Sequence, residues 1–129
     1  MKFTVTYINK NVQIYKLQYP MCSPSIICQT NFLQEYTIYK YVSEDDDLFK
    51  KIAQNYDRRF YHVFILHEDC PGIDHVGIVH FISGLFSNKN IPILYLNTYS
   101  HNVIFVNEEH LEEALLILKN NPHVIFSID

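Results

Sequence analysis

The sequence predicts an α+β protein built from two fused ferredoxin-like (βαββαβ) units, of which the first is degenerate. Residues 60–129 read as strand, helix, strand, strand, helix, strand, while residues 1–57 read as strands followed by one helix. A chain of 129 residues with 48% hydrophobic content is enough for one compact domain or two very small ones. We therefore expect an N-terminal unit over residues 1–57 and a C-terminal domain over residues 58–129.

Strand patterns dominate the N-terminal part. Alternating apolar and polar residues predict four strands, at residues 3–8, 12–17, 26–30 and 35–42. Asn9, Lys10 and Asn11 read as a turn between the first two, and a second turn is expected near residues 31–34. The break between Pro20 and Pro24 stands where a complete unit would have its first helix.

A change of period at Ser43 predicts a helix. Ser43 and Asp46 have the spacing of a capping box, and the acidic run 44–47 suits a helix start. This run lacks the central glycine of a calcium-binding loop, so we interpret it as a solvated helix start. The apolar side chains recur at helical spacing, at Phe49, Ile52, Ala53 and Tyr56.

The C-terminal part is more regular. Strands are expected at residues 60–66, 93–98, 103–106 and 124–128. Asp74 can cap a helix that runs to about residue 88 with Val76, Val79, Ile82 and Phe86 on one face. Asn107 can cap a second helix, whose core-facing residues are Leu111, Ala114, Leu115 and Leu118.

Composition and charge exclude several functions. A net charge of −4 argues against nucleic acid or an anionic membrane as a partner, and 3 glycines leave no glycine-rich phosphate cradle. No segment has the length of a membrane span or the pattern of a signal peptide. The odd number of cysteines, Cys22, Cys28 and Cys70, suggests reduced thiols and a cytoplasmic location.

The sequence predicts no metal, no cofactor and no catalytic residues. The histidine pairs 62/67 and 75/80 are each five residues apart, which places their side chains on different sides of a strand or helix. His67 and Cys70 lie in one short segment, but a nucleophile usually takes its base from elsewhere in the fold. An enzyme is thus the least favoured reading.

The segment 67–75 is the strongest candidate for a ligand site. Gly72 permits close backbone approach, Asp74 opens the following helix, and Glu68 and Asp69 add negative charge. These groups complement both ends of a zwitterion such as an amino acid. An ordinary capped turn accounts for the same residues, and spacing alone favours that interpretation over a ligand site.

Two segments resemble ACT domains. Residues 71–79, PGIDHVGIV, are similar to the ligand loop and helix start of these domains. Residues 91–106, IPILYLNTYSHNVIFV, resemble the I-x-I-x-x-x-S-T-Y-x-T-D-x-x-L-V segment of small tandem-ACT proteins and of the cytosolic arginine sensor (CASTOR) family. Residues 107–111 match the x-E-x-x-L helix start that follows.

The resemblance implies two ACT units and a non-catalytic regulatory protein that binds a small amino acid where two units meet and modulates a protein partner. One unit would supply the loop and helix start, here Gly72, Ile73, Asp74, His75 and Ile78. The other would supply a strand edge and turn, here Pro92, Ile93 and Asn102. Since the arginine sensors carry four units in one chain, a homodimer of this chain is expected.

Two positions depart from the family pattern. Asn102 and His75 stand where the family has acidic residues, and both replacements remove charge that would face a guanidinium. They argue against arginine as the ligand without excluding it, and leave another amino acid, or none, open. A ligand-free dimerisation or scaffold module is therefore the alternative function.

Overall fold

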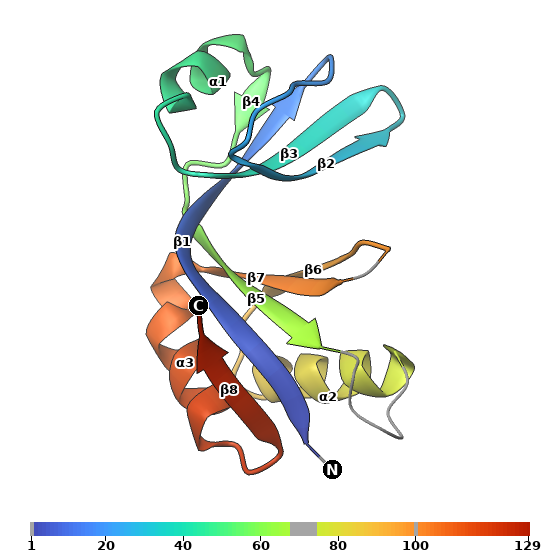
Figure 1. Cartoon of the computed structure of the whole chain (residues 1–129), viewed down its shortest axis with the longest axis vertical. Helices are drawn as coiled ribbons and strands as arrows, with labels where there is room; N and C mark the ends of the chain where they lie inside the picture. The colour runs from blue at the N-terminus through green and yellow to red at the C-terminus, as the bar shows by residue number, and fades with distance from the viewer. Residues whose placement is uncertain (1, 68–74, 100) are drawn as a thin grey trace. The chain divides into compact units, whose positions relative to one another are not determined.

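The computed structural model describes residues 2–67, 75–99 and 101–129 and combines helices with a sheet (Figure 1). The helices are α1 (Asp46–Ile52), α2 (His75–Ser87), the 3₁₀ helix η1 (Glu108–His110) and α3 (Leu111–Asn120). The strands are β1 (Phe3–Leu17), β2 (Ile26–Phe32), β3 (Glu35–Tyr41), β4 (Asn55–Tyr56), β5 (Tyr61–His67), β6 (Ile93–Asn97), β7 (Asn102–Asn107) and β8 (Val124–Ile128). The predicted α+β class is confirmed.

Two compact units make up the chain. We call Met1–Asn9 together with His62–Asp129 the composite unit, and Lys10–Tyr61 the inserted unit. The long strand β1 contributes residues to both. The strand order is β2-β3-β1-β5-β7-β6, with β4 and β8 also paired to β1. The boundary at residues 57 and 58, and the description as two fused ferredoxin-like units, remain predictions.

The composite unit contains one strand more than a four-stranded βαββαβ unit. Residues 3–7 of β1 pair in parallel with β8, and β5 is the other neighbour of β1. β7 follows β5, and β6 pairs antiparallel with β7 at the edge of the sheet. The N-terminal strand therefore completes the sheet to which the C-terminal part contributes β5–β8.

Helix α2 buries one face in the core of the composite unit. Ile78, Ile82 and Phe86 are at most 1% exposed and recur at every fourth position, as expected for a helix stripe. The sequence placed Val79 on this face, but Val79 is half-buried and Ile78 takes the core position. From α3, Ala114 and Leu118 are fully buried in the same core, as predicted.

Helix α2 ends in a Schellman motif. Asn90 has a φ of 57°, and its backbone N–H donates to the carbonyl of Ser87. The N–H of Ile91 donates to the carbonyl of Phe86, and both of these side chains are in the core. Asparagine tolerates the left-handed backbone that this motif requires, so the predicted helix end near residues 88–90 is confirmed.

The inserted unit has a smaller core of its own. The second part of β1 pairs antiparallel with β3 and with the short strand β4, and β2 pairs with β3. Tyr15, Leu17, Ile38 and Phe49 are nearly fully buried there. The connection 18–25 contains no helix, and the Gln29 side-chain amide both accepts from and donates to the backbone of Met21.

Two predicted elements of this part were wrong. The expected turn at Asn9–Asn11 does not form, because β1 continues through it as one strand of 15 residues. The expected helix from Ser43 to Tyr56 is shorter: α1 ends at Ile52, and Tyr56 lies in β4, where it pairs with Tyr15 of β1. In both places backbone pairing with a distant segment overrides the local pattern.

The longest helix described, α2, has 13 residues, and none of the helices in the described parts of the chain is long and apolar enough to cross a membrane.

Candidate functional site

The predicted ligand loop lies mostly outside the described residues. This applies to Gly72, Ile73 and Asp74. His75 is the first residue of α2, and Ile78, one turn further, is 1% exposed and packs in the core of the composite unit. The structure therefore fixes where the helix that follows the loop begins.

The other predicted ligand residues lie on the β6–β7 hairpin, at its two opposite ends. Pro92 is exposed and directly precedes Ile93, which begins β6 and pairs with Val106. Asn102 begins β7, is 5% exposed, and pairs with Asn97 at the far end of β6. At about 3.3 Å per residue, Ile93 and Asn102 are separated by about 13 Å along the hairpin.

Helix α2 separates His75, its first residue, from the start of this hairpin. Its C-terminal end leads within a few residues to Pro92, and the helix is about 20 Å long at 1.5 Å per residue. Pro92 and Ile93 are therefore remote from His75 within one unit. Asn102 lies beyond the β6–β7 turn, at the end of the hairpin opposite to Ile93.

A buried histidine lies on the core side of β5. His62 is 4% exposed, and its Nδ1 lies 2.9 Å from the hydroxyl oxygen of Tyr7 on β1. Its Nε2 is buried without a hydrogen-bond partner among the described residues, and the nearest carboxylate oxygen, from Glu108, is 3.8 Å away. Burial lowers the pKa of His62, and the nearby Glu108 only partly opposes this effect.

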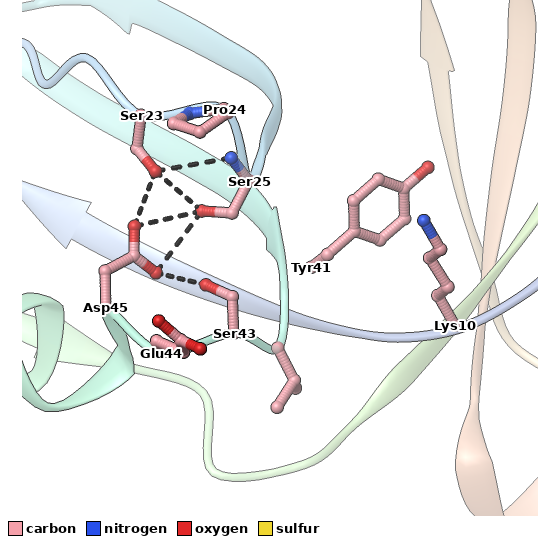
Figure 2. Close-up of a pocket in the computed structure, with 9 residues that line it drawn as sticks. Lys10, Ser23, Pro24, Ser25, Tyr41, Ser43, Glu44 and Asp45 are labelled. Carbon is pink, nitrogen blue, oxygen red and sulfur yellow. Dashed lines mark hydrogen bonds between the residues drawn. The ribbon is translucent and has the colours of Figure 1, made fainter.

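The inserted unit holds a surface cavity of about 790 Å³. Figure 2 shows the residues that line it, which come from three segments: the start of the inserted unit, the loop before β2, and the connection from β3 to α1. They are Lys10, Ser23, Pro24, Ser25, Tyr41, Val42, Ser43, Glu44 and Asp45. All nine of these described residues belong to the inserted unit.

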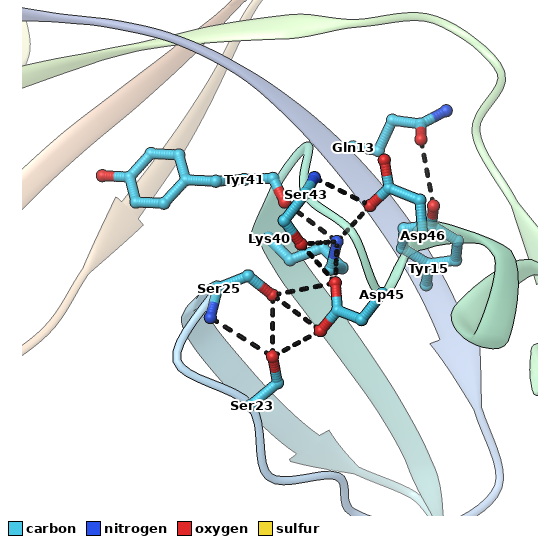
Figure 3. A network of polar contacts seen from close by, with 9 residues as sticks. All are labelled: Gln13, Tyr15, Ser23, Ser25, Lys40, Tyr41, Ser43, Asp45 and Asp46. Atoms are coloured by element: carbon cyan, nitrogen blue, oxygen red, sulfur yellow. Dashed lines mark hydrogen bonds and ion pairs between the residues drawn. The ribbon is translucent and has the colours of Figure 1, made fainter.

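One wall of this cavity is fixed by the carboxylate of Asp45 (Figure 3). The hydroxyls of Ser23, Ser25 and Ser43 donate to it, with Ser25 Oγ 3.1 Å from Oδ2. Lys40 Nζ lies 2.9 Å from Oδ1. Burial tends to raise the pKa of Asp45, but the hydrogen bonds from the serines and Lys40 outweigh it and hold the pKa well below its usual range.

Lys40 is the cation of this network, and its side chain is fully buried. Its Nζ also contacts the carboxylate of Asp46 and donates to the carbonyl of Tyr41 at 2.9 Å. The centre of the Phe49 ring lies 5.1 Å from Nζ. Asp46 in turn accepts from the backbone N–H of Ser43 at 3.2 Å, which is one half of the predicted capping box.

The two remaining charged groups of the cavity face it from its rim. Lys10 Nζ lies 4.9 Å from the centre of the Tyr41 ring, a cation–π contact, and makes no ion pair within the described residues. Glu44 is exposed and has neither a hydrogen bond nor an ion pair there. Val42, which also lines the cavity and is 44% exposed, adds an apolar surface.

The sequence interpretation missed this cavity. It read Ser43 and the acidic run as a helix start alone and gave no role to Ser23 and Ser25. One signal was available. Lys40 lies two residues after Ile38 on β3, and side chains two residues apart in a strand point to the same face, so both are expected on the buried face. A lysine on that face requires an acidic partner, and the following run 44–47 supplies it.

Comparison with known protein families finds a match, within the composite unit. Residues 62–120 match the family described as ACT domain. ACT domains are typically regulatory and ligand-binding rather than catalytic, and among curated proteins none is similar enough to this chain to count as a match.

Two solved structures share the fold of most of the chain. Protein Atu0741 from Agobacterium tumefaciens is 16% identical, with a TM-score of 0.71 over 100% of this chain and 95% of that one. Protein VC0802 from Vibrio cholerae, of unknown function, is 13% identical, with a TM-score of 0.73 over 92% of this chain and 88% of that one. At these identities the likeness shows the fold alone.

Within residues 2–67, 75–99 and 101–129, no three His, Cys, Asp or Glu side chains gather in a way that could hold a metal ion. Cys22 is exposed and Cys28 half-buried, and both are free thiols.

Proposed function

We propose that this chain is a regulatory protein whose ACT domain binds a small amino acid and thereby modulates a protein partner. The observation that carries the proposal is the ACT domain at residues 62–120, because this range contains every ligand position that the sequence predicts. The loop with Gly72 and Asp74 would meet the ammonium and carboxylate groups of the ligand. Arginine is the weaker choice of ligand, since Asn102 and His75 replace acidic residues.

The position of Pro92 supports a homodimer as the binding form. Pro92 and Ile93 lie at the end of the composite unit that is remote from His75, so a ligand at the start of α2 could contact them only from a second copy. The tandem-ACT arrangement and the relation to the cytosolic arginine sensors belong to this proposal. So does a cytoplasmic location, which the free thiols of Cys22 and Cys28 favour.

Isothermal titration of the full chain with each standard amino acid tests the proposal. We expect saturable heat with at least one of them. Asp74→Ala should abolish the part of that heat that comes from the loop at residues 67–75, because this change removes the carboxylate predicted to contact the ligand. Glu112→Ala, an exposed change on α3, is the matched control and should leave binding intact. Absence of heat with every amino acid at millimolar concentration would contradict amino-acid sensing.

A scaffold without a ligand is the second candidate. Exposed apolar side chains favour it: in the composite unit Leu94 on the edge strand β6, Leu116, Ile125 and Ile128 are 42–55% exposed. Under this function, sedimentation would show a dimer that Leu94→Asp dissociates, and no amino acid would change its stability. Asp74→Ala would then cost only about 1 kcal/mol of stability, the value of a helix cap.

A further inference from the structure

We propose that the cavity of the inserted unit is a second binding site, for a zwitterionic amino acid with an apolar side chain. The site lies outside residues 62–120 and does not depend on the function proposed for the ACT domain. Its volume of about 790 Å³ is within the range of small-molecule sites, about 300–1,000 Å³. The lining residues supply two charges of opposite sign and an apolar surface.

The cavity is preformed. Hydrogen bonds from Ser23 and Ser25 to Asp45 hold the loop before β2 against the turn before α1, and Ser43 and Lys40 bind the same carboxylate. With four donors, Asp45 has used the acceptor positions that a carboxylate offers. We therefore assign Asp45 a structural role in the wall, and leave ligand contact to other groups.

Glu44 and Lys10 are the groups free to bind. Neither has an ion-pair partner among the residues the structure describes. Lys40 and Asp45, in contrast, form an ion pair with each other. Figure 2 shows Glu44 and Lys10 on different sides of the cavity, with Tyr41 beside Lys10. An ammonium group suits Glu44 and a carboxylate suits Lys10, since each would form a charge-assisted hydrogen bond.

The apolar part of the cavity lining indicates which kind of ligand side chain would bind. Pro24, Val42 and the ring of Tyr41 line the cavity, and Val42 is 44% exposed although it is a large apolar residue. A ligand with an apolar side chain would cover this surface and gain free energy by doing so. A simple anion would leave Glu44 opposed by like charge, and a simple amine would leave Lys10 unused, so a zwitterion fits best.

Titration followed by ¹H–¹⁵N NMR of the full chain tests this site. The probes are leucine, methionine and phenylalanine; for the tightest of them, the amine that lacks the carboxylate and the acid that lacks the amino group are added. We expect saturable shifts of the amides of residues 23, 25 and 41–44. Lys10→Met and Glu44→Gln should each weaken binding about tenfold, the effect of one lost charge-assisted contact.

Matched control variants and the ligand analogues distinguish recognition of the two ligand charges from a general effect of the substitutions. Lys51→Met and Asp47→Asn, exposed changes on α1, should not alter the affinity. On the unaltered chain, each analogue should bind about tenfold more weakly than the amino acid, which tests charge recognition without any variant.

The result that overturns the proposal is the absence of shifts at residues 23, 25 and 41–44 with all three probes. Equal affinity for the amino acid and both analogues, or shifts unaffected by Lys10→Met and Glu44→Gln, would overturn it as well. Asp74→Ala separates the two sites. Binding lost in Asp74→Ala belongs to the ACT loop and overturns the second site, whereas cavity binding that persists there stands even if the ACT domain binds nothing.

Discussion

The ammonium nitrogen of Lys40 lies 2.9 Å from Asp45 Oδ1, in a position where the lysine side chain has no contact with solvent. The partner carboxylates remain partly accessible, with Asp45 at 28% and Asp46 at 15% side-chain exposure. A charge removed from water in this way is tolerated because it is paired and because Tyr41 supplies a further acceptor. The ion pair therefore holds the start of α1 against β3, and the hydrogen bonds of Ser23 and Ser25 to the same Asp45 carboxylate hold the loop before β2 there.

Replacing Lys40 by methionine should strongly destabilise the inserted unit. Lys40→Met retains the length and apolar contacts of the side chain but leaves Asp45 and Asp46 without their cation. We expect a loss of about 3 kcal/mol in the free energy of unfolding, measured by urea denaturation at neutral pH.

The matched control for this prediction is Lys51→Met, an exposed lysine on α1, which should change stability by less than about 0.5 kcal/mol. In the triple variant Lys40→Met/Asp45→Asn/Asp46→Asn, much of the lost stability should return, because no unpaired charge remains. A Lys40→Met protein as stable as the unaltered chain would contradict the role assigned to the pair.

The β2–β3 hairpin should be stabilised by glycine at its turn. Leu33 and Gln34 form a two-residue loop with φ angles of 50° and 64°, a left-handed backbone that ordinary side chains disfavour. Gln34→Gly should therefore raise the unfolding free energy by about 1 kcal/mol. Gln34→Ala, measured in the same urea series, should give no comparable gain; equal effects of both changes would show that backbone strain is not the cause.

Local sequence determined the elements whose contacts are close along the chain. The β6–β7 hairpin, the Asn107 cap and α3 were predicted because strand alternation and helical spacing suffice there. The turn expected at Asn9–Asn11 failed because distant partners satisfy its backbone: Asn9 donates to the carbonyl of Asp129, and Asn11 accepts from Val42. No local pattern reports such pairing.

The two candidate sites also differ in whether the sequence could predict them. The ACT loop could be proposed because its residues are contiguous, and a family resemblance covered them. The cavity joins Lys10, residues 23–25 and residues 41–45, which are separated along the chain and have no shared spacing. Only Lys40, on the buried face of β3 with Ile38, indicated from the sequence that charged groups are paired next to this cavity.

Alanine at position 84 should stabilise α2. Gly84 lies inside the helix, and a Cβ atom built there would have no neighbouring atom within 4 Å. Because glycine costs about 0.5–1 kcal/mol relative to alanine in a helix interior, Gly84→Ala should raise the free energy of unfolding by about that amount. Thermal denaturation should show a higher midpoint, and a lower one would mean that close packing, absent from this structure, requires the glycine.

Acid should destabilise the composite unit through His62. Burial lowers the pKa of His62 in the folded chain below its ordinary value of 6.5. The unfolded chain therefore binds a proton at His62 more readily than the folded chain does. The free energy of unfolding has its full value above the ordinary pKa of histidine, where His62 is neutral in both states, and decreases as the pH falls below that pKa. Tyr7 beside Nδ1 and Glu108 near Nε2 are the titratable groups that face the ring.

His62→Asn tests this pH dependence, because asparagine places an acceptor near the position of Nδ1 and stays neutral throughout the range. Unfolding free energies measured from slightly alkaline to mildly acidic pH should fall more steeply for the unaltered chain than for the variant. The substitution itself should lower stability by a constant amount, since it leaves space in the core, so the slope rather than the absolute value carries the result. Parallel slopes would show that His62 titrates alike in the folded and unfolded chains. Glu108→Gln should steepen the fall, because the carboxylate of Glu108 partly offsets the effect of burial on His62.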